Sequence, residues 1–112
     1  MKSGRMRVLF FEDRYAGCWS AQCLDHDIAT QAKTLPELYY ELHRLILGHL
    51  IISVELQREP FAGLPKAPQK FWDIYRQSSY HLQVKRNPFR VPQKFAGRMP
   101  VPDLRIADLQ AV

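Results

Sequence analysis

The chain has 112 residues, enough for one domain that buries a core without help from disulfides or metals. Hydrophobic residues make up 46% of it, an ordinary share for a globular protein, so neither a disordered chain nor a membrane span is indicated. The net charge of +5 comes from the second half, because residues 1–57 hold six Lys or Arg against seven Asp or Glu, whereas residues 58–112 hold ten against four.

Three strand-like runs open the chain, at residues 7–12, 15–23 and 28–33. The first is apolar on both faces, and the second alternates between apolar and polar side chains, as a half-buried antiparallel strand does. The polar stretch 12–14 has the composition of a tight hairpin loop, and 25–27 has that of a turn. These signals predict a three-stranded antiparallel meander.

A capped helix follows the third run and begins at Thr34. The Thr34 side chain can accept the backbone N–H three residues on, Glu37 can reach back to the N–H of Thr34, and Pro36 suits the first turn. Gly48 costs about 1 kcal/mol in a helix interior, but we expect the helix to continue to about Leu56. Its predicted core-facing stripe consists of Leu35, Leu38, Leu42, Leu45, His49, Ile52 and Leu56.

A second apolar set lies beside this stripe and widens the apolar arc of the helix: Tyr39, Ile46, Leu50 and Val54. A helix that is apolar over so wide an arc must bury two sides, one of them on its own sheet. Two interpretations stay open for the other side. Either the C-terminal half of the chain covers it, or these four residues form an oligomer or partner interface, which would make the protein a homodimer or a higher oligomer.

The second half is proline-rich, since seven of the eight prolines lie after position 59. Residues 67–76 predict a short helix with a proline at its start, and 80–86 alternate as a strand does. The prolines of 87–102 are expected to break regular structure, and 103–109 recover a strand pattern. The side chains of the short helix predicted to point inward are Phe71, Ile74 and Tyr75.

Together these elements predict an α+β fold with the order β-β-β-α-β. A three-stranded antiparallel meander and a further strand pack on one long helix. We expect a single domain over 1–112, with its core in 5–57 and about 100–109. A Pro-rich basic insertion that contains the short helix occupies about 58–99.

No group of residues predicts catalysis, a bound cofactor or a metal. Five acids lie at strand ends or at the helix start, where carboxylates could converge on Mg²⁺: Glu12, Asp13, Asp25, Asp27 and Glu37. Turn and capping roles account for them better, so we expect a protein that is not an enzyme. Cys18, Cys23 and His26 offer only three ligands on disagreeing strand faces, whereas structural zinc takes four.

Basic and aromatic residues alternate within positions 85–98, which contain no acid. This mixture is typical of segments that contact phosphates and stack on bases, so it predicts nucleic-acid contact. An acidic protein partner is a competing use of the same charge, and a merely solvated segment is a third interpretation. The candidate residues are Lys85, Arg86, Arg90, Lys94 and Arg98, with Phe89 and Phe95 between them.

The sequence indicates a cytoplasmic protein without a membrane anchor. The basic N-terminus leads into only four consecutive apolar residues, too few for a signal peptide, and the apolar stretch 45–54 is too short to span a bilayer. Cys18 and Cys23 fall on opposite faces of the predicted strand, so no disulfide is expected between them.

The segment 19–38 carries an ordered series of short motifs. WSAQCLD at 19–25 is followed by Thr-Gln at 30–31 and by TLPEL at 34–38. This order and spacing resembles the N-terminal domain of the HicB antitoxin family, although two glycines of the family pattern, in the turn after the second strand and before the helix cap, are missing. Pro-Val-Pro at 100–102 is similar to the proline-marked entry to that family's last strand.

The resemblance implies the β-β-β-α-β sheet and an assembly that is dimeric or higher. The family's role is to bind and silence a small HicA-type ribonuclease, and many members add a C-terminal DNA-binding segment, of which no helix-turn-helix pattern is seen here. The family is also similar to the ribonuclease H fold, but the acids above do not favour a nuclease. We therefore expect a self-associating, non-enzymatic HicB-like interaction module that binds a small ribonuclease toxin. The alternative is a small RNA- or DNA-binding protein that uses residues 85–98.

Overall fold

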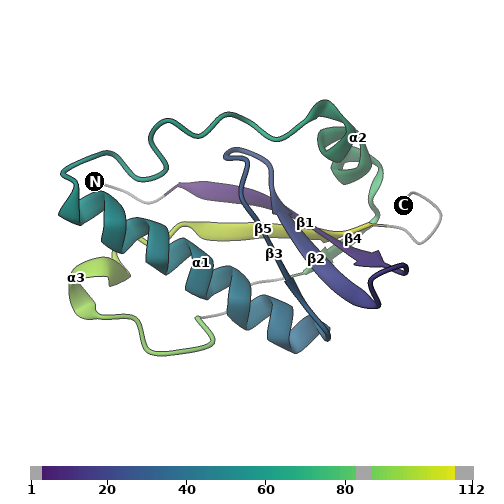
Figure 1. Ribbon diagram of the computed structural model, residues 1–112, viewed down its shortest axis with the longest axis horizontal. Helices are drawn as coiled ribbons and strands as arrows, with labels where there is room; N and C mark the ends of the chain where they lie inside the picture. Colours follow the sequence, from purple (N-terminus) through teal and green to yellow (C-terminus); the bar gives the residue numbers. More distant parts are fainter. Residues whose placement is uncertain (1–3, 83–86, 108–112) are drawn as a thin grey trace.

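The computed structural model describes residues 4–82 and 87–107, which form five strands and three helices. Their bounds are β1 Arg5–Asp13, β2 Cys18–Cys23, β3 Ala29–Ala32, α1 Leu35–Glu55, α2 Gln69–Gln77, β4 Tyr80–Leu82, α3 Gln93–Ala96 and β5 Val101–Ile106. The strands form one sheet in the order β3-β2-β1-β5-β4. In Figure 1, α1 and α3 lie on one side of this sheet and α2 lies on the other. The protein is therefore of the mixed α+β class, as predicted.

The three N-terminal strands form the predicted antiparallel meander, in which β1 pairs with β2 and β2 with β3. The connection between β1 and β2 is longer than expected, because residues 14–17 form a turn and β2 begins only at Cys18. The Asp13 carboxylate accepts two backbone N–H groups of this turn, each at 3.1 Å, and Gly17 supplies a positive φ of 66°.

The C-terminal strand β5 lies between β1 and β4, parallel to β1 and antiparallel to β4. The prediction that residues 87–102 lack regular structure is wrong, since α3 forms within them and β5 already begins at Val101. Pro92 is the residue before α3, where a missing N–H leaves no helical hydrogen bond unmade. Of the predicted strand 80–86, the first three residues form β4 and 83–86 lie outside the described residues.

Pro102 lies inside β5, where a proline usually disrupts pairing. Val101 donates its N–H to Gly4 on the β1 side, so the backbone nitrogen of Pro102 faces the opposite side. On that side β4 pairs only with residues from Leu104 onward. The ladder with β1 therefore requires no N–H at position 102, and among the described residues β4 does not reach it, so the proline fits the strand.

Helix α1 begins and continues as the sequence predicts. The Thr34 hydroxyl accepts the N–H of Glu37 at 3.3 Å, which is one of the two predicted capping bonds. The helix passes through Gly48 without interruption and ends at Glu55. Among the described residues, none of the helices combines the length and the apolar character that crossing a bilayer takes.

The end of α1 reverses the chain in a defined direction. Gln57 adopts a left-handed φ of 53° and donates its N–H to Val54 at 3.2 Å, while Arg58 donates to Ser53 at 2.8 Å. These two bonds are those of the Schellman motif, in which glycine is the usual left-handed residue. The motif directs the chain after Gln57 back toward the sheet.

The buried face of α1 is rotated away from the predicted stripe. Two of the stripe's residues, Ile52 and Leu56, are 55% and 54% exposed. Phe95 and Met99 belong to the same buried cluster as α1, so the C-terminal half of the chain covers the second side of the helix. This packing agrees with the first of the two open interpretations, and the oligomeric state stays a prediction. The α1 side chains that lie fully in the core are Leu38, Leu42, His43, Ile46 and Leu50.

A second, smaller core lies on the opposite face of the sheet, under α2. Its buried members are Leu9, Leu24, Ala67, Trp72, Tyr75 and Ala107. Trp72, which the sequence prediction left out, is buried with Tyr75, whereas Phe71 and Ile74 are only partly buried. The indole N–H of Trp72 donates to the carbonyl of Ala67 at 3.2 Å, so this large ring also satisfies its one polar group.

Candidate functional site: an arginine-rimmed pocket

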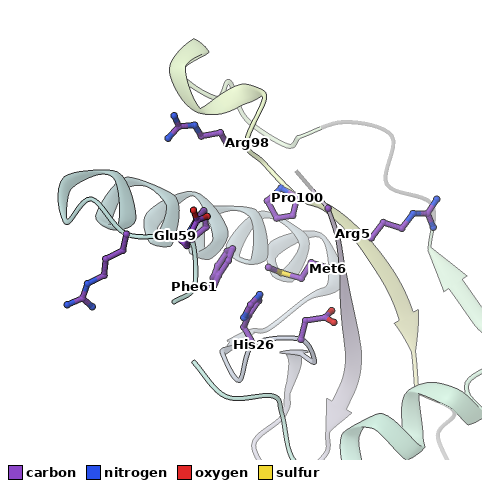
Figure 2. Close-up of a pocket in the computed structure, with 11 residues that line it drawn as sticks. Arg5, Met6, His26, Glu59, Phe61, Arg98 and Pro100 are labelled. Carbon is purple, nitrogen blue, oxygen red and sulfur yellow. The ribbon is translucent and has the colours of Figure 1, made fainter. Parts of the chain in front are cut away.

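A pocket of about 380 Å³ opens where four segments meet: the start of β1, the β2–β3 loop, the segment after α1 and the segment before β5. Pockets that hold small groups usually have about 300–1,000 Å³. Its floor includes Met6, His26, Phe61 and Pro100, which Figure 2 shows together. Its rim includes Arg5, Arg58, Glu59 and Arg98. We call this site the arginine-rimmed pocket.

Phe61 is the central ring of the floor. It stacks on His26 with ring centroids 4.8 Å apart and planes 20° apart, and its centroid lies 5.6 Å from that of His49 on α1. Only 9% of Phe61 is exposed, and its φ is 63°, in the left-handed region that a bulky side chain rarely adopts. The segment after α1 is thus held in an uncommon backbone conformation by ring contacts on the pocket side.

The β2–β3 loop that carries His26 is fixed at both ends. Cys23 donates its N–H to Ile28 at 2.9 Å across the loop, and Asp27 donates its N–H to Pro65 at 2.7 Å. The side-chain amide of Gln22 donates to the Asp27 carboxylate at 2.8 Å. The loop therefore presents His26 from a backbone that is tied both to the sheet and to the segment after α1.

Asp25 lines the pocket, but its charge is already paired. Its carboxylate accepts the guanidinium of Arg7 at 2.6 Å and the backbone N–H of Arg7 at 2.8 Å. Partial burial disfavours the carboxylate, but the hydrogen bonds and the charge of Arg7 outweigh it and lower the pKa of Asp25. The Arg7 guanidinium also lies 4.6 Å from the centroid of the Trp72 ring. Arg7 therefore contacts both Asp25 in the β2–β3 loop and Trp72 in α2.

The rim carries an excess of positive charge. Within the described residues, no carboxylate lies within 4.0 Å of Arg58 or Arg98, and Arg5 reaches Asp103 only at 3.9 Å with 79% of its side chain exposed. Glu59 is the one acid on this rim, and it forms no ion pair with the described part of the chain. Three guanidinium groups therefore surround an apolar floor with one opposing carboxylate.

These groups suit binding of anions better than proton transfer. Burial lowers the pKa of His26, the charge of Asp25 opposes this in part, and His49 adds a smaller lowering effect. His26 is therefore mostly neutral at pH 7, with its ring stacked on Phe61. Arginine stays charged at any physiological pH, so the rim supplies fixed positive charge and hydrogen-bond donors.

The structure divides the four residues predicted as an oligomer or partner interface into two buried and two partly buried residues. Ile46 is fully buried and Leu50 is 1% exposed, both in the main core cluster. Tyr39 and Val54 are partly buried and pack against the same cluster. Ile46 and Leu50 are buried because they pack in the same cluster as sheet residues such as Val8 and Phe10. Self-association of the chain stays a prediction.

The predicted nucleic-acid segment is divided by the structure. Lys85 and Arg86 lie outside the described residues, while Arg90, Lys94 and Arg98 are exposed. Phe95 is 5% exposed in the core, and Phe89 packs edge-on against Tyr40 with centroids 5.2 Å apart. The two rings are thus engaged within the chain and are not arranged to stack on bases. Of the described residues in this segment, Arg98 is the one that lines the pocket.

The cysteines and His26 do not assemble into a metal site. Cys23 is buried in the main core, and burial raises the pKa of its thiol to about 12. Cys18, at the other end of β2, is a second free thiol. Across residues 4–82 and 87–107, no three His, Cys, Asp or Glu side chains form a group that could hold a metal ion.

Most of the pocket escaped the sequence analysis. Arg5, Arg58 and Arg98 stand far apart in the chain and share no motif. Phe61 lies in a short Pro-Phe-Ala-Gly stretch with no periodic pattern, and His26 was considered only as a metal ligand. The excess of basic residues after position 57 was the one available signal, and it does include two of the three rim arginines.

Comparison of the chain with protein-family models, with curated proteins and with solved structures found no match in any of the three.

Proposed function

We propose that the chain is a non-enzymatic, HicB-like interaction module that binds an acidic segment of a protein partner at the arginine-rimmed pocket. The observation that carries the proposal is the placement of Arg5, Arg58 and Arg98, from three separate segments, around one apolar floor. Complementary charge at such a surface steers association and selects the partner.

The topology supports the HicB-like part of the proposal. Three antiparallel strands lead into a capped helix, and a later strand returns beside β1 and parallel to it. With α2, β4 and α3 set aside, this element order is compatible with the β-β-β-α-β order that the sequence resemblance implies. The partner implied by the resemblance is a small HicA-type ribonuclease, which would have to present an acidic segment to the pocket. The self-association that the resemblance also implies is measured by light scattering of the purified chain.

The engagement of the acids supports a module that is not an enzyme. Asp13 accepts two N–H groups of its turn, and Asp25 is paired with Arg7. Asp27 accepts the amide of Gln22. Carboxylates held in this way do not converge on a common point where a metal-dependent nuclease would bind its ions.

Nucleic-acid binding is the alternative, and one observation favours it. Arg90 and Lys94 are exposed in the segment around α3, where they can contact phosphates. Because Phe89 and Phe95 are engaged within the chain, this contact would be electrostatic and would not depend on base stacking.

One titration separates the two functions. Fluorescence anisotropy compares a labelled polyglutamate peptide with a labelled single-stranded RNA of similar length at physiological salt. We expect the peptide to bind the wild-type chain, to bind Arg58→Glu/Arg98→Glu at least tenfold more weakly, and to bind Arg90→Glu/Lys94→Glu almost as well as wild type. The second double variant has the same net charge as the first, so it controls for non-specific attraction.

Three results would contradict the proposal. They are equal loss of peptide binding in both double variants, no peptide binding at all, and RNA binding that is abolished by Arg90→Glu/Lys94→Glu while the peptide stays unbound. The last result would establish the nucleic-acid alternative. A melting curve of each variant checks that it folds, since exposed charges of this kind contribute little to stability.

A further inference from the structure

The charges on the rim are spread apart. In Figure 2 the guanidinium groups of Arg5 and Arg98 lie on opposite sides of the pocket and point away from each other, with Pro100 between them. A compact anion such as phosphate is held by donors that converge on it. The geometry instead fits negative charges that are separated along an extended ligand.

The space between these charges is apolar. Met6 is 2% exposed and Phe61 is 9% exposed. Both side chains are packed in the core, and the small part of each that remains accessible forms an apolar wall of the pocket. His26 adds the face of a ring that is stacked on Phe61 and is mostly neutral at pH 7. An ion placed here would lose its hydration, which costs free energy, whereas burial of an apolar side chain is favourable.

We propose that the arginine-rimmed pocket takes one large apolar side chain of an acidic peptide segment, whose flanking carboxylates pair with Arg98 on one side and Arg5 on the other. The inference rests on the proposed function and specifies the ligand of the same site. The apolar anchor provides most of the affinity, and the flanking carboxylates fix the position of the segment.

Removal of the Glu59 charge should strengthen, and not weaken, binding of an acidic ligand. This carboxylate lies on the rim near the positive groups and opposes any acidic ligand. Glu59→Gln removes the charge and keeps the shape, so we expect it to tighten binding of an acidic peptide about two- to fivefold. The same change at Glu55, which is exposed at the end of α1 and does not line the pocket, serves as the control.

The deciding experiment uses three labelled peptides of equal length with the full chain: polyglutamate with a central phenylalanine, the same peptide with glycine at the centre, and polylysine with a central phenylalanine. We expect the first to bind about tenfold or more tightly than the second, because only the first buries a ring in the pocket. The third is expected not to bind.

A pocket variant localises this preference. Gly4 lines the pocket, and a Cβ built at this position meets no atom within 4 Å, so Gly4→Leu starts from open space and adds an apolar side chain at the pocket wall. We expect this variant to lose the preference for the phenylalanine peptide and to keep its weak affinity for the glycine peptide. Gly48→Leu adds the same side chain where a Cβ also meets no atom within 4 Å, but away from the pocket, and should leave the preference intact.

The outcomes distinguish this inference from the proposed function. Equal affinity of the two glutamate peptides, both weakened by Arg58→Glu/Arg98→Glu, would leave the proposed function standing and overturn the apolar anchor. Failure of both peptides to bind would overturn both. Phenylacetate that competes as strongly as the phenylalanine peptide would show a small aromatic anion to be the ligand and would overturn the peptide assignment.

Discussion

The ring of Phe61 stacks on the ring of His26 at a centroid distance of 4.8 Å, and it does so from a backbone with a φ of 63°. A left-handed conformation costs a residue with a Cβ about 1–2 kcal/mol. The conformation is held because the ring is buried among His26, His49 and the main core. The floor of the pocket thus depends on Phe61, where the free energy gained by burying the ring offsets the free-energy cost of the left-handed backbone.

Replacement of Phe61 by glycine is expected to be less harmful than replacement by alanine. Both variants lose the buried ring, at about 3 kcal/mol or more, but glycine relieves the left-handed backbone and should be the more stable by about 0.5–1 kcal/mol. Chemical denaturation measures the difference. Phe95 is the matched control, since it is equally buried but lies in α3, where alanine should be the more stable replacement. The same order at both positions would contradict the strain at Phe61.

His43 is expected to make the protein less stable in mild acid. Its Nδ1 lies 2.9 Å from the carbonyl of Tyr39 and must carry the proton, so Nε2 is an acceptor, which has no hydrogen-bond partner among the described residues. Burial lowers the pKa of His43, and the bond to Tyr39 only partly opposes this. The unfolded chain therefore binds the proton more readily than the folded one, and stability is lost as the pH falls through about 6.5.

The variant His43→Leu tests this dependence. It removes the titrating group and the unpaired acceptor, and at pH 8 it should lie within about 1.5 kcal/mol of the wild type. Denaturation curves between pH 8 and pH 5 should show the wild type losing stability relative to the variant, at no more than about 1.4 kcal/mol per pH unit. Parallel curves for the two proteins over this range would rule out His43 as the cause.

The pair of Arg7 and Asp25 is expected to lose its effect at low pH. Asp25 has a lowered pKa in the folded protein, so its contribution is present above about pH 4 and is lost as the pH falls through the unfolded value toward the folded one. Because the two side chains are 48% and 22% exposed, the contribution at pH 7 is at most about 1 kcal/mol. Asp25→Asn should differ from the wild type by that amount at pH 7 and converge with it near pH 2. A difference that stays constant with pH would mean that the charge of Asp25 is not responsible.

The elements with local signals were predictable from the sequence. The start of α1 is determined by Thr34 and its hydroxyl bond to the N–H of Glu37, three residues away, and the meander is encoded in strand patterns with polar turns. The prolines of the second half were more ambiguous. Pro92 precedes a short helix, where no N–H is required, and Pro102 lies in a strand with its nitrogen directed away from β1.

The face of α1 and the pocket depend on contacts between distant parts of the chain. Two adjacent sides of α1 are apolar, and local hydropathy does not specify that Ile46 and Leu50 enter the core while Ile52 stays 55% exposed. Arg5 and Arg98 line the same pocket because β5 pairs with β1. No pattern within a single segment predicts contacts between distant segments, so the pocket could be recognised only in the structure.

Gln57 is a position where a substitution should stabilise the protein. It occupies the left-handed site of the Schellman motif with a φ of 53°, which glycine adopts at no steric cost. Gln57→Gly is expected to raise the free energy of unfolding by about 0.5–1 kcal/mol. Gln57→Ala keeps the Cβ and should change little, so thermal and chemical denaturation of the two variants isolates the backbone term. A glycine variant less stable than the alanine variant would contradict this account.

Gly48 offers the opposite test, because it lies in the interior of α1 with an ordinary helical backbone. A Cβ built there meets no atom within 4 Å, so alanine gains helix propensity without a clash, and Gly48→Ala should stabilise the protein by about 1 kcal/mol. Gly17 is the matched control, since its Cβ position is equally open but its φ is 66°. Gly17→Ala should therefore destabilise the protein by about 1 kcal/mol. Stabilisation by both substitutions would show that available space, and not backbone conformation, decides the effect, and it would remove the physical basis for the expectations at Gln57 and Phe61 as well.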